Sequence, residues 1–328
     1  MQLADVDIYL FQDPSSGLGN GAMQTDFSIP LPDACLPACR TALPEAISAP
    51  RRVLESQQAG RVSYYADTQA QGRPLVLVHS INAAPSAFEM RPLFEHFRSQ
   101  RPVFAPDLPG FGFSDRSARR YSPELYADAL TDFLAEVVRE PADVVAFSLG
   151  SEFAARAALA VPEAFTSLVI LSPTGFSKRS LPSGNLSVRV HKALSLPYLS
   201  QGLFSLLTSR PSIRYFLGQA FVGQTPPEMV DYAYATAHQP GARYAPLYFL
   251  SGQLFTPNAA DMLYAKLKLP ALALYDRDPN ISFDLLPDLI AQHSNWRAER
   301  ISPTSGIPHW EKTAETVAAM ERFWADLT

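Results

Sequence analysis

The fold is decided by the stretch V-V-A-F-S-L-G-S, residues 144–151. An apolar run of strand type ends at Ser148, and an alanine-rich run of helical type begins at Gly150. A serine at so tight a strand-to-helix turn has a strained backbone, which pushes its hydroxyl above the sheet edge. Because strand and helix nearly touch there, the residues two before and two after the serine must be small, and they are Ala146 and Gly150. The stretch predicts a nucleophile elbow, although an ordinary helix N-cap at Ser148 is the competing interpretation.

Short apolar runs alternate with helical runs on both sides of this turn. Strands are predicted at residues 61–66, 74–79, 103–106, 143–147, 168–171, 271–275 and 296–301. Helices are predicted at residues 86–98, 123–138, 150–160, 283–291 and 310–327. This rhythm predicts an α/β fold with a mostly parallel, doubly wound sheet covered by helices on both faces.

The rhythm stops between residues 176 and 254, where aromatic-rich helical pieces are broken by Pro and Gly. We interpret residues 176–254 as a helical cap inserted above the edge where such sheets place their sites. The core then comprises residues 51–175 and 255–328. Residues 1–50 form an N-terminal extension rich in Pro, Gly and Ser, in which residues 6–11 suit a short strand or an apolar anchor.

Composition disfavours several classes of protein. A net charge of −5 over 328 residues gives no overall electrostatic attraction to nucleic acid or to an anionic membrane. No apolar run is long enough to span a membrane, and residues 1–13 lack a secretory signal, so we expect a cytoplasmic protein. Cys35 and Cys39 are the only cysteines and are interpreted as free thiols. With no metal, nucleotide or flavin signature, we expect neither a metal nor a cofactor.

Three further landmarks accompany the elbow. D-L-P-G-F-G-F-S at residues 107–114 follows a strand, V-H at residues 78–79 ends another strand, and D-P at residues 278–279 lies near the end of a late strand. Together with the elbow they resemble the α/β-hydrolase superfamily over residues 52–327, and the layout is similar to its members with a helical cap. The resemblance implies the α/β-hydrolase fold and a triad of serine, histidine and a carboxylate.

The resemblance also implies an oxyanion hole. Its donors are the backbone N–H groups of Leu149, directly after the nucleophile, and of Ile81, in the loop after a strand. Ser80 stands where the family usually has Gly, and the Asn82 side chain is a candidate additional donor. His79 is expected to be structural.

The orienting carboxylate is assigned by the same resemblance. L-Y-D-R-D-P at residues 274–279 is similar to the family's acid-bearing strand end, which places the acid at Asp278. Asp276, only two residues away, is the rival.

The base is the least settled position. His309 is the only one of the six histidines that follows the last predicted strand, and it is the candidate. In S-G-I-P-H-W-E at residues 305–311, however, the family resemblance places the catalytic histidine at Gly306. A shift of three residues spans up to about 10 Å of extended chain. Either the loop is rearranged so that His309 reaches Ser148, or the base is lost and His309 is structural.

These roles predict acyl chemistry. A serine nucleophile disfavours the dehalogenase and epoxide hydrolase branches, which need a carboxylate at the elbow. Ser–His–Asp with backbone oxyanion donors suits a carboxylic ester, or a related acyl or carbon–carbon bond, cleaved through an acyl-enzyme. We predict a carboxylesterase-type enzyme for a small apolar or aromatic acyl substrate. Cap aromatics, Tyr215 and Phe216 among them, would line its pocket or pack the cap on the core. A non-catalytic ligand-binding protein on a hydrolase scaffold and an acyltransferase or perhydrolase are the alternatives.

Overall fold

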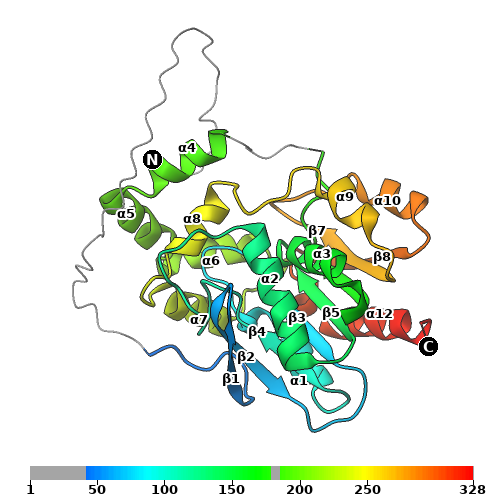
Figure 1. Ribbon diagram of the computed structural model, residues 1–328. Helices are drawn as coiled ribbons and strands as arrows, with labels where there is room; N and C mark the ends of the chain where they lie inside the picture. Colours follow the sequence, from blue (N-terminus) through cyan, green and yellow to red (C-terminus); the bar gives the residue numbers. More distant parts are fainter. Residues whose placement is uncertain (1–41, 179–184, 328) are drawn as a thin grey trace. The chain divides into compact units, whose positions relative to one another are not determined.

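The computed structural model describes residues 42–178 and 185–327, and eight strands form one sheet in this part of the chain (Figure 1). The strands are β1 (Arg51–Ser56), β2 (Gly60–Asp67), β3 (Leu75–Val78), β4 (Val103–Pro106), β5 (Ala142–Phe147), β6 (Phe165–Leu171), β7 (Ala271–Arg277) and β8 (Trp296–Ser305). Their order is β1-β2-β4-β3-β5-β6-β7-β8, with β1–β2 and β2–β4 antiparallel and every other pair parallel. The predicted mostly parallel sheet is confirmed. The expectations for residues 6–11 and for Cys35 and Cys39 lie outside the described residues.

Helices cover both faces of this sheet (Figure 1). All residues of β3, β4 and β5 are buried, as their continuous apolar runs predict, because each strand has helices above and below it. The helices and helical turns of the core are η1 (Ala87–Met90), α1 (Arg91–Phe97), α2 (Pro123–Phe133), η2 (Leu134–Val138), α3 (Gly150–Ala160), η3 (Pro162–Ala164), α9 (Ala259–Met262), η4 (Tyr264–Lys266), α10 (Leu286–Gln292), α11 (Pro308–Glu311) and α12 (Thr313–Ala325). Side chains of α2 and α3 pack in the core on one face, and those of α1 and α12 pack on the other.

The range predicted to form the cap is helical. Between residues 176 and 254 the described part contains no strand, and its helices are α4 (Asn185–Leu194), α5 (Pro197–Leu207), α6 (Arg210–Gln219), α7 (Pro227–Ala237) and α8 (Tyr244–Leu250). Two contacts join helix α7 to the core. Tyr232 stacks on Phe88 with ring centroids 4.6 Å apart, and Glu228 forms an ion pair with Arg91. Nowhere in the described chain is a helix both long and apolar enough to cross a membrane.

Three elements differ from the sequence-based expectation. Strand β1 was not predicted, because it begins with the exposed polar residues Arg51 and Arg52 and has no continuous apolar run. The helix predicted over residues 123–138 ends as an α-helix at Phe133 and continues as the π-helical turn η2. The predicted terminal helix is divided into α11 and α12.

The glycine-rich loop after β4 is built around one buried carboxylate. Asp107 accepts hydrogen bonds from the backbone N–H groups of Ala87 and Phe113, each at 2.9 Å. Burial raises the pKa of Asp107 to about 6. Gly112 has a φ of +52°, and a Cβ there would lie 2.0 Å from the Asp107 Cγ. Only glycine fits this position, so the loop depends on Gly112.

Candidate active site

Ser148 lies at the turn between β5 and α3 with a φ of +52°, a conformation that residues with a side chain rarely adopt. Its backbone N–H donates to the Leu171 carbonyl at 2.9 Å, which fixes the turn against β6. A Cβ at Gly150 would lie 2.4 Å from the His79 carbonyl oxygen, so even alanine does not fit there without a shift of the backbone. The N-cap of α3 is Leu149, without a side-chain cap. The elbow geometry is therefore the predicted one, and the N-cap interpretation of Ser148 is wrong.

The Ser148 hydroxyl and two backbone N–H groups are without partners at this edge of the sheet. Within the described chain, the Oγ of Ser148 makes no hydrogen bond, and the N–H groups of Leu149 and Ile81 donate to no acceptor. Strand β3, which leads to Ile81, pairs in parallel with β5, which leads to Ser148. A hydroxyl and two free donors at adjacent strand ends can act as the nucleophile and the oxyanion donors of acyl transfer, which also needs a base.

The loop that carries Ile81 is held by Glu89, which the sequence reasoning missed. The Glu89 carboxylate accepts from Ser80 N at 2.9 Å, from Ser80 Oγ at 3.0 Å and from Asn82 Nδ2 at 2.8 Å. Burial raises the pKa of this carboxyl, and the donated hydrogen bonds oppose that effect. Asn82 Nδ2 also donates to Ser80 Oγ at 2.9 Å, so both of its protons are used. The suggestion that Asn82 adds an oxyanion donor is therefore wrong.

His79 has the structural role expected of it. Its Nδ1 donates to the Ser80 carbonyl at 2.6 Å, and its Nε2 accepts from Leu108 N at 2.9 Å. Burial lowers the pKa of His79 to about 4, so the ring is neutral near pH 7. With both nitrogens engaged, His79 joins β3 to the loop after β4.

The two candidate acids differ in their contacts. Asp276 accepts from Arg300 Nε at 3.1 Å and from Thr304 N at 3.0 Å, and so ties β7 to β8. Burial acts to raise the pKa of Asp276, but these donors outweigh it and the pKa is lowered. Asp278 accepts from Asn280 N at 2.8 Å and Ile281 N at 3.1 Å through Oδ1 alone. Its Oδ2 accepts no hydrogen bond from any described residue, and burial raises its pKa.

The free oxygen of Asp278 faces Gly306. A Cβ built on Gly306, whose φ is +115°, would lie 2.9 Å from Asp278 Oδ2. Residue 306 is the position at which the family resemblance places the catalytic histidine. The structure thus brings together the predicted acid and the usual position of the base, but the residue there has no side chain.

His309 is not joined to Ser148 or to Asp278. It is fully buried, and its Nε2 donates to the Glu89 carbonyl oxygen at 2.9 Å. Its ring lies edge-on to Phe147, with centroids 4.9 Å apart, and its Nδ1 has no partner within the described residues. Since a carbonyl only accepts, Nε2 carries the proton, and burial lowers the pKa of His309 to about 4. These contacts give His309 a structural role in the free chain, and its role as the base stays a prediction.

The two neutral histidines make stability depend on pH. With a folded pKa of about 4 against an ordinary value of 6.5, His79 and His309 bind fewer protons folded than unfolded between these values. The free energy of unfolding therefore rises with pH across this window, by up to about 3 kcal/mol for each ring. Asp107 opposes this, because its raised pKa makes the folded state bind more protons below about pH 6.

We expect His309→Gln to lower the slope of unfolding free energy against pH by about 1.4 kcal/mol per pH unit near pH 5. Urea unfolding at half-unit steps from pH 4.5 to 6.5 measures this slope. Equal slopes for the variant and the wild type would show that His309 does not stay neutral in the folded chain.

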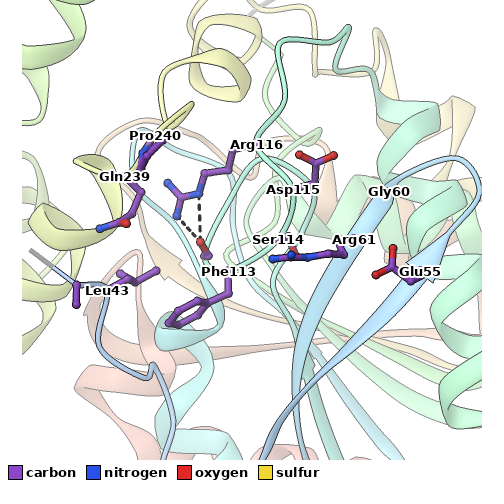
Figure 2. Close-up of a pocket in the computed structure, with 12 residues that line it drawn as sticks. Leu43, Glu55, Gly60, Arg61, Phe113, Ser114, Asp115, Arg116, Gln239 and Pro240 are labelled. Carbon is purple, nitrogen blue, oxygen red and sulfur yellow. Dashed lines mark hydrogen bonds between the residues drawn. The ribbon is translucent and has the colours of Figure 1, made fainter. Parts of the chain in front are cut away.

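A separate groove of about 750 Å³ lies beside β1, β2 and the loop after β4 (Figure 2). Arg116 forms part of its wall, donating to the Gly112 carbonyl and, at 2.7 Å, to the carbonyl of Thr236 in α7. None of the predicted site residues lines this groove. The candidate active site is therefore identified by the residues around Ser148 and not by this groove.

Comparison with known proteins agrees with the geometry. The profile of the alpha/beta hydrolase family matches residues 75–319, most of the chain. The chain belongs to the α/β hydrolase family.

Two curated relatives match parts of the chain. An uncharacterized hydrolase, YugF, from Bacillus subtilis (strain 168) is 34% identical over 42% of this chain. The 2-hydroxymuconate semialdehyde hydrolase of Pseudomonas sp. (strain CF600) is 32% identical over 32% of it. The chain spans 50% of the first relative and 38% of the second.

Solved structures share the fold over most of the chain. A serine hydrolase involved in carbazole degradation (CarC) has a TM-score of 0.67 at 15% identity, covering 84% of this chain and 98% of its own. A thermophilic esterase from Thermogutta terrifontis has a TM-score of 0.66 at 16% identity, covering 85% and 99%. At these identities the likeness establishes the fold alone.

Proposed function

We propose that this α/β hydrolase is a serine hydrolase that cleaves a carboxylic ester or a related acyl bond. The observation that carries the proposal is the unbonded Ser148 hydroxyl at a positive-φ elbow, at the same sheet edge as the free N–H groups of Leu149 and Ile81. The names of the semialdehyde hydrolase and the esterase are consistent with this class of reaction.

In this mechanism the Ser148 Oγ attacks the carbonyl carbon and loses its proton to a base. The carbonyl oxygen takes the electron pair and is stabilised by the N–H groups of Leu149 and Ile81. The alcohol leaves with the proton, and the acyl group remains esterified to Ser148. Water then attacks the acyl-enzyme, releasing the carboxylic acid and restoring the hydroxyl.

The proposed base is His309, the histidine that follows β8. To serve Ser148 it must release the Glu89 carbonyl, because Nε2 is held there in the free enzyme. Catalytic hydrogen bonds often form only when substrate is bound. For His309→Gln we expect a loss of at least about 100-fold in kcat on p-nitrophenyl esters, measured on protein shown by circular dichroism to be folded. Unchanged kcat would assign His309 to structure alone.

A specific observation favours a second candidate, a non-catalytic ligand-binding protein. Gly306 offers no imidazole to the free Asp278 oxygen, and His309 is held elsewhere. The two candidates are separated with p-nitrophenyl esters of graded acyl length. Turnover by folded wild-type protein supports the hydrolase. Saturable binding of an acyl compound without turnover supports the second candidate.

The two aspartates are expected to respond differently to amide substitution. Asp278→Asn should lower kcat by at least about 100-fold with little change in stability, since its carboxylate orients the base. Asp276→Asn should instead lower the free energy of unfolding by about 1–3 kcal/mol and leave kcat nearly unchanged, because it weakens the contacts to Arg300 and Thr304. Ester hydrolysis and urea unfolding of both variants measure this, and the reverse pattern would make Asp276 the acid.

A further inference from the structure

The outward side of α4 combines apolar and basic side chains. Leu186 and Val188 are 37% and 42% exposed, and Arg189 and Lys192 are exposed beside them. Ser187 is buried, so α4 has an inner side and a separate outer one. An amphipathic helix whose outer side is apolar and basic is typical of peripheral membrane contacts.

Helices α5 and α6, which contact each other, continue the same combination. Leu206 on α5 is 68% exposed, and Tyr215 and Phe216 on α6 are 61% and 54% exposed. Arg214 is exposed next to the two aromatic rings. Both rings are therefore more than half exposed, and neither is part of the buried core. The two rings contact each other edge to face, with centroids 5.3 Å apart, and more than half of each side chain faces outward.

The charge of this region is opposite to that of the whole chain. Residues 185–219, which span α4 to α6, contain four Lys or Arg residues and no Asp or Glu, although the net charge of the protein is −5. Arg189, Lys192 and Arg214 form no ion pair within the described ranges. Arg210 is the exception, since it pairs with Asp231 of α7.

We propose that α4, α5 and α6 are a docking surface for an anionic phospholipid bilayer. Exposed leucine and aromatic side chains enter the headgroup boundary, and the unpaired cations meet lipid phosphates. This contact is peripheral and needs no membrane-spanning helix. A second copy of the chain fits less well, because a symmetric contact through α4, α5 and α6 would bring like cations together, and these three helices carry no Asp or Glu to pair with them.

Co-sedimentation of the full chain with vesicles tests the proposal. Vesicles of phosphatidylcholine alone are compared with vesicles containing one quarter phosphatidylglycerol, at 0.05 M and 0.5 M NaCl. We expect binding to the anionic vesicles, and weaker binding at high salt because screening shortens the reach of the cations. No binding to anionic vesicles, or equal binding to both kinds, would overturn the proposal.

Matched variants locate the surface. Arg189→Glu with Lys192→Glu should weaken anionic-vesicle binding by at least about tenfold, whereas Lys266→Glu with Lys268→Glu makes the same charge change outside the cap and should have little effect.

For the apolar part, Leu206→Ser with Phe216→Ser should weaken binding, and the control Val53→Ser with Met262→Ser, also at exposed apolar positions, should not. All these side chains are exposed, and thermal unfolding confirms that each variant is folded. Equal losses for surface and control variants contradict the assignment. Self-association that Leu206→Ser with Phe216→Ser abolishes, without vesicle binding by the wild type, would show that a second copy is the partner.

Discussion

Ser148→Ala is expected to lose at least about 1,000-fold in kcat toward p-nitrophenyl esters. The substitution removes the only hydroxyl that the elbow presents, while alanine keeps the backbone and the oxyanion donors. The expected unfolding free energy is close to that of the wild type, or slightly higher, since Ser148 Oγ makes no hydrogen bond within the described residues. Initial rates and urea unfolding on the same preparations measure both quantities.

Ser151→Ala is the matched control for this variant. Ser151 is the second residue of α3, and its buried hydroxyl donates to the Ala146 carbonyl at 3.1 Å. Its loss should cost about 1 kcal/mol of stability and leave kcat within a few-fold of wild type. Equal rates for Ser148→Ala and the wild type would remove Ser148 from the mechanism.

Gly112→Ala is expected to be the most destabilising single-methyl addition in the core, at more than about 4 kcal/mol or with no folded protein recovered. The new Cβ would lie 2.0 Å from the Asp107 Cγ, and the φ of +52° strains any side chain. Asp107 in turn holds two backbone N–H groups. The loop cannot accept the methyl group without releasing this carboxylate.

Gly202→Ala in α5 and Gly218→Ala in α6 are controls for this prediction. A Cβ at either position meets nothing within 4 Å, so alanine should stabilise the helix by about 0.5–1 kcal/mol. Chemical unfolding of the three variants compares them directly. Wild-type stability for Gly112→Ala would mean that the loop after β4 has another conformation.

The sheet and the elbow were predictable because local sequence determines them. Buried parallel strands are continuous apolar runs, and β4 was predicted residue for residue at 103–106. The elbow needs small residues at fixed spacing around a serine, which is visible as Ala146 and Gly150. Strand β1 escaped prediction because an edge strand exposes its side chains and has no such pattern.

The rest of the site depends on contacts between distant segments. Glu89 holds the oxyanion loop and, through its carbonyl, His309, yet in the sequence it is one acidic residue on a helical run. The sequence raised Asn82 as a donor, but the structure shows both of its amide protons occupied. The sequence left two roles open for His309, the base or a structural residue. It could not decide between them, because the residues around Gly306 do not determine the conformation of this loop.

The net charge of the whole chain does not predict the charge of the cap. The total of −5 is a sum over the whole chain, whereas the cap range, residues 176–254, contains seven Lys or Arg residues and only two Asp or Glu residues. Long-range attraction depends on the local arrangement within about one Debye length, roughly 10 Å at 0.1 M salt.

The most direct test of the Ser148 elbow is mass spectrometry after treatment with an alkyl fluorophosphonate. An activated serine oxygen attacks the phosphorus of this reagent, forms a P–O bond and displaces fluoride, and the serine proton goes to a base. We predict one adduct, located by peptide mapping at Ser148 and absent from Ser148→Ala. An adduct on another serine, or none on folded protein that hydrolyses esters, would contradict the account.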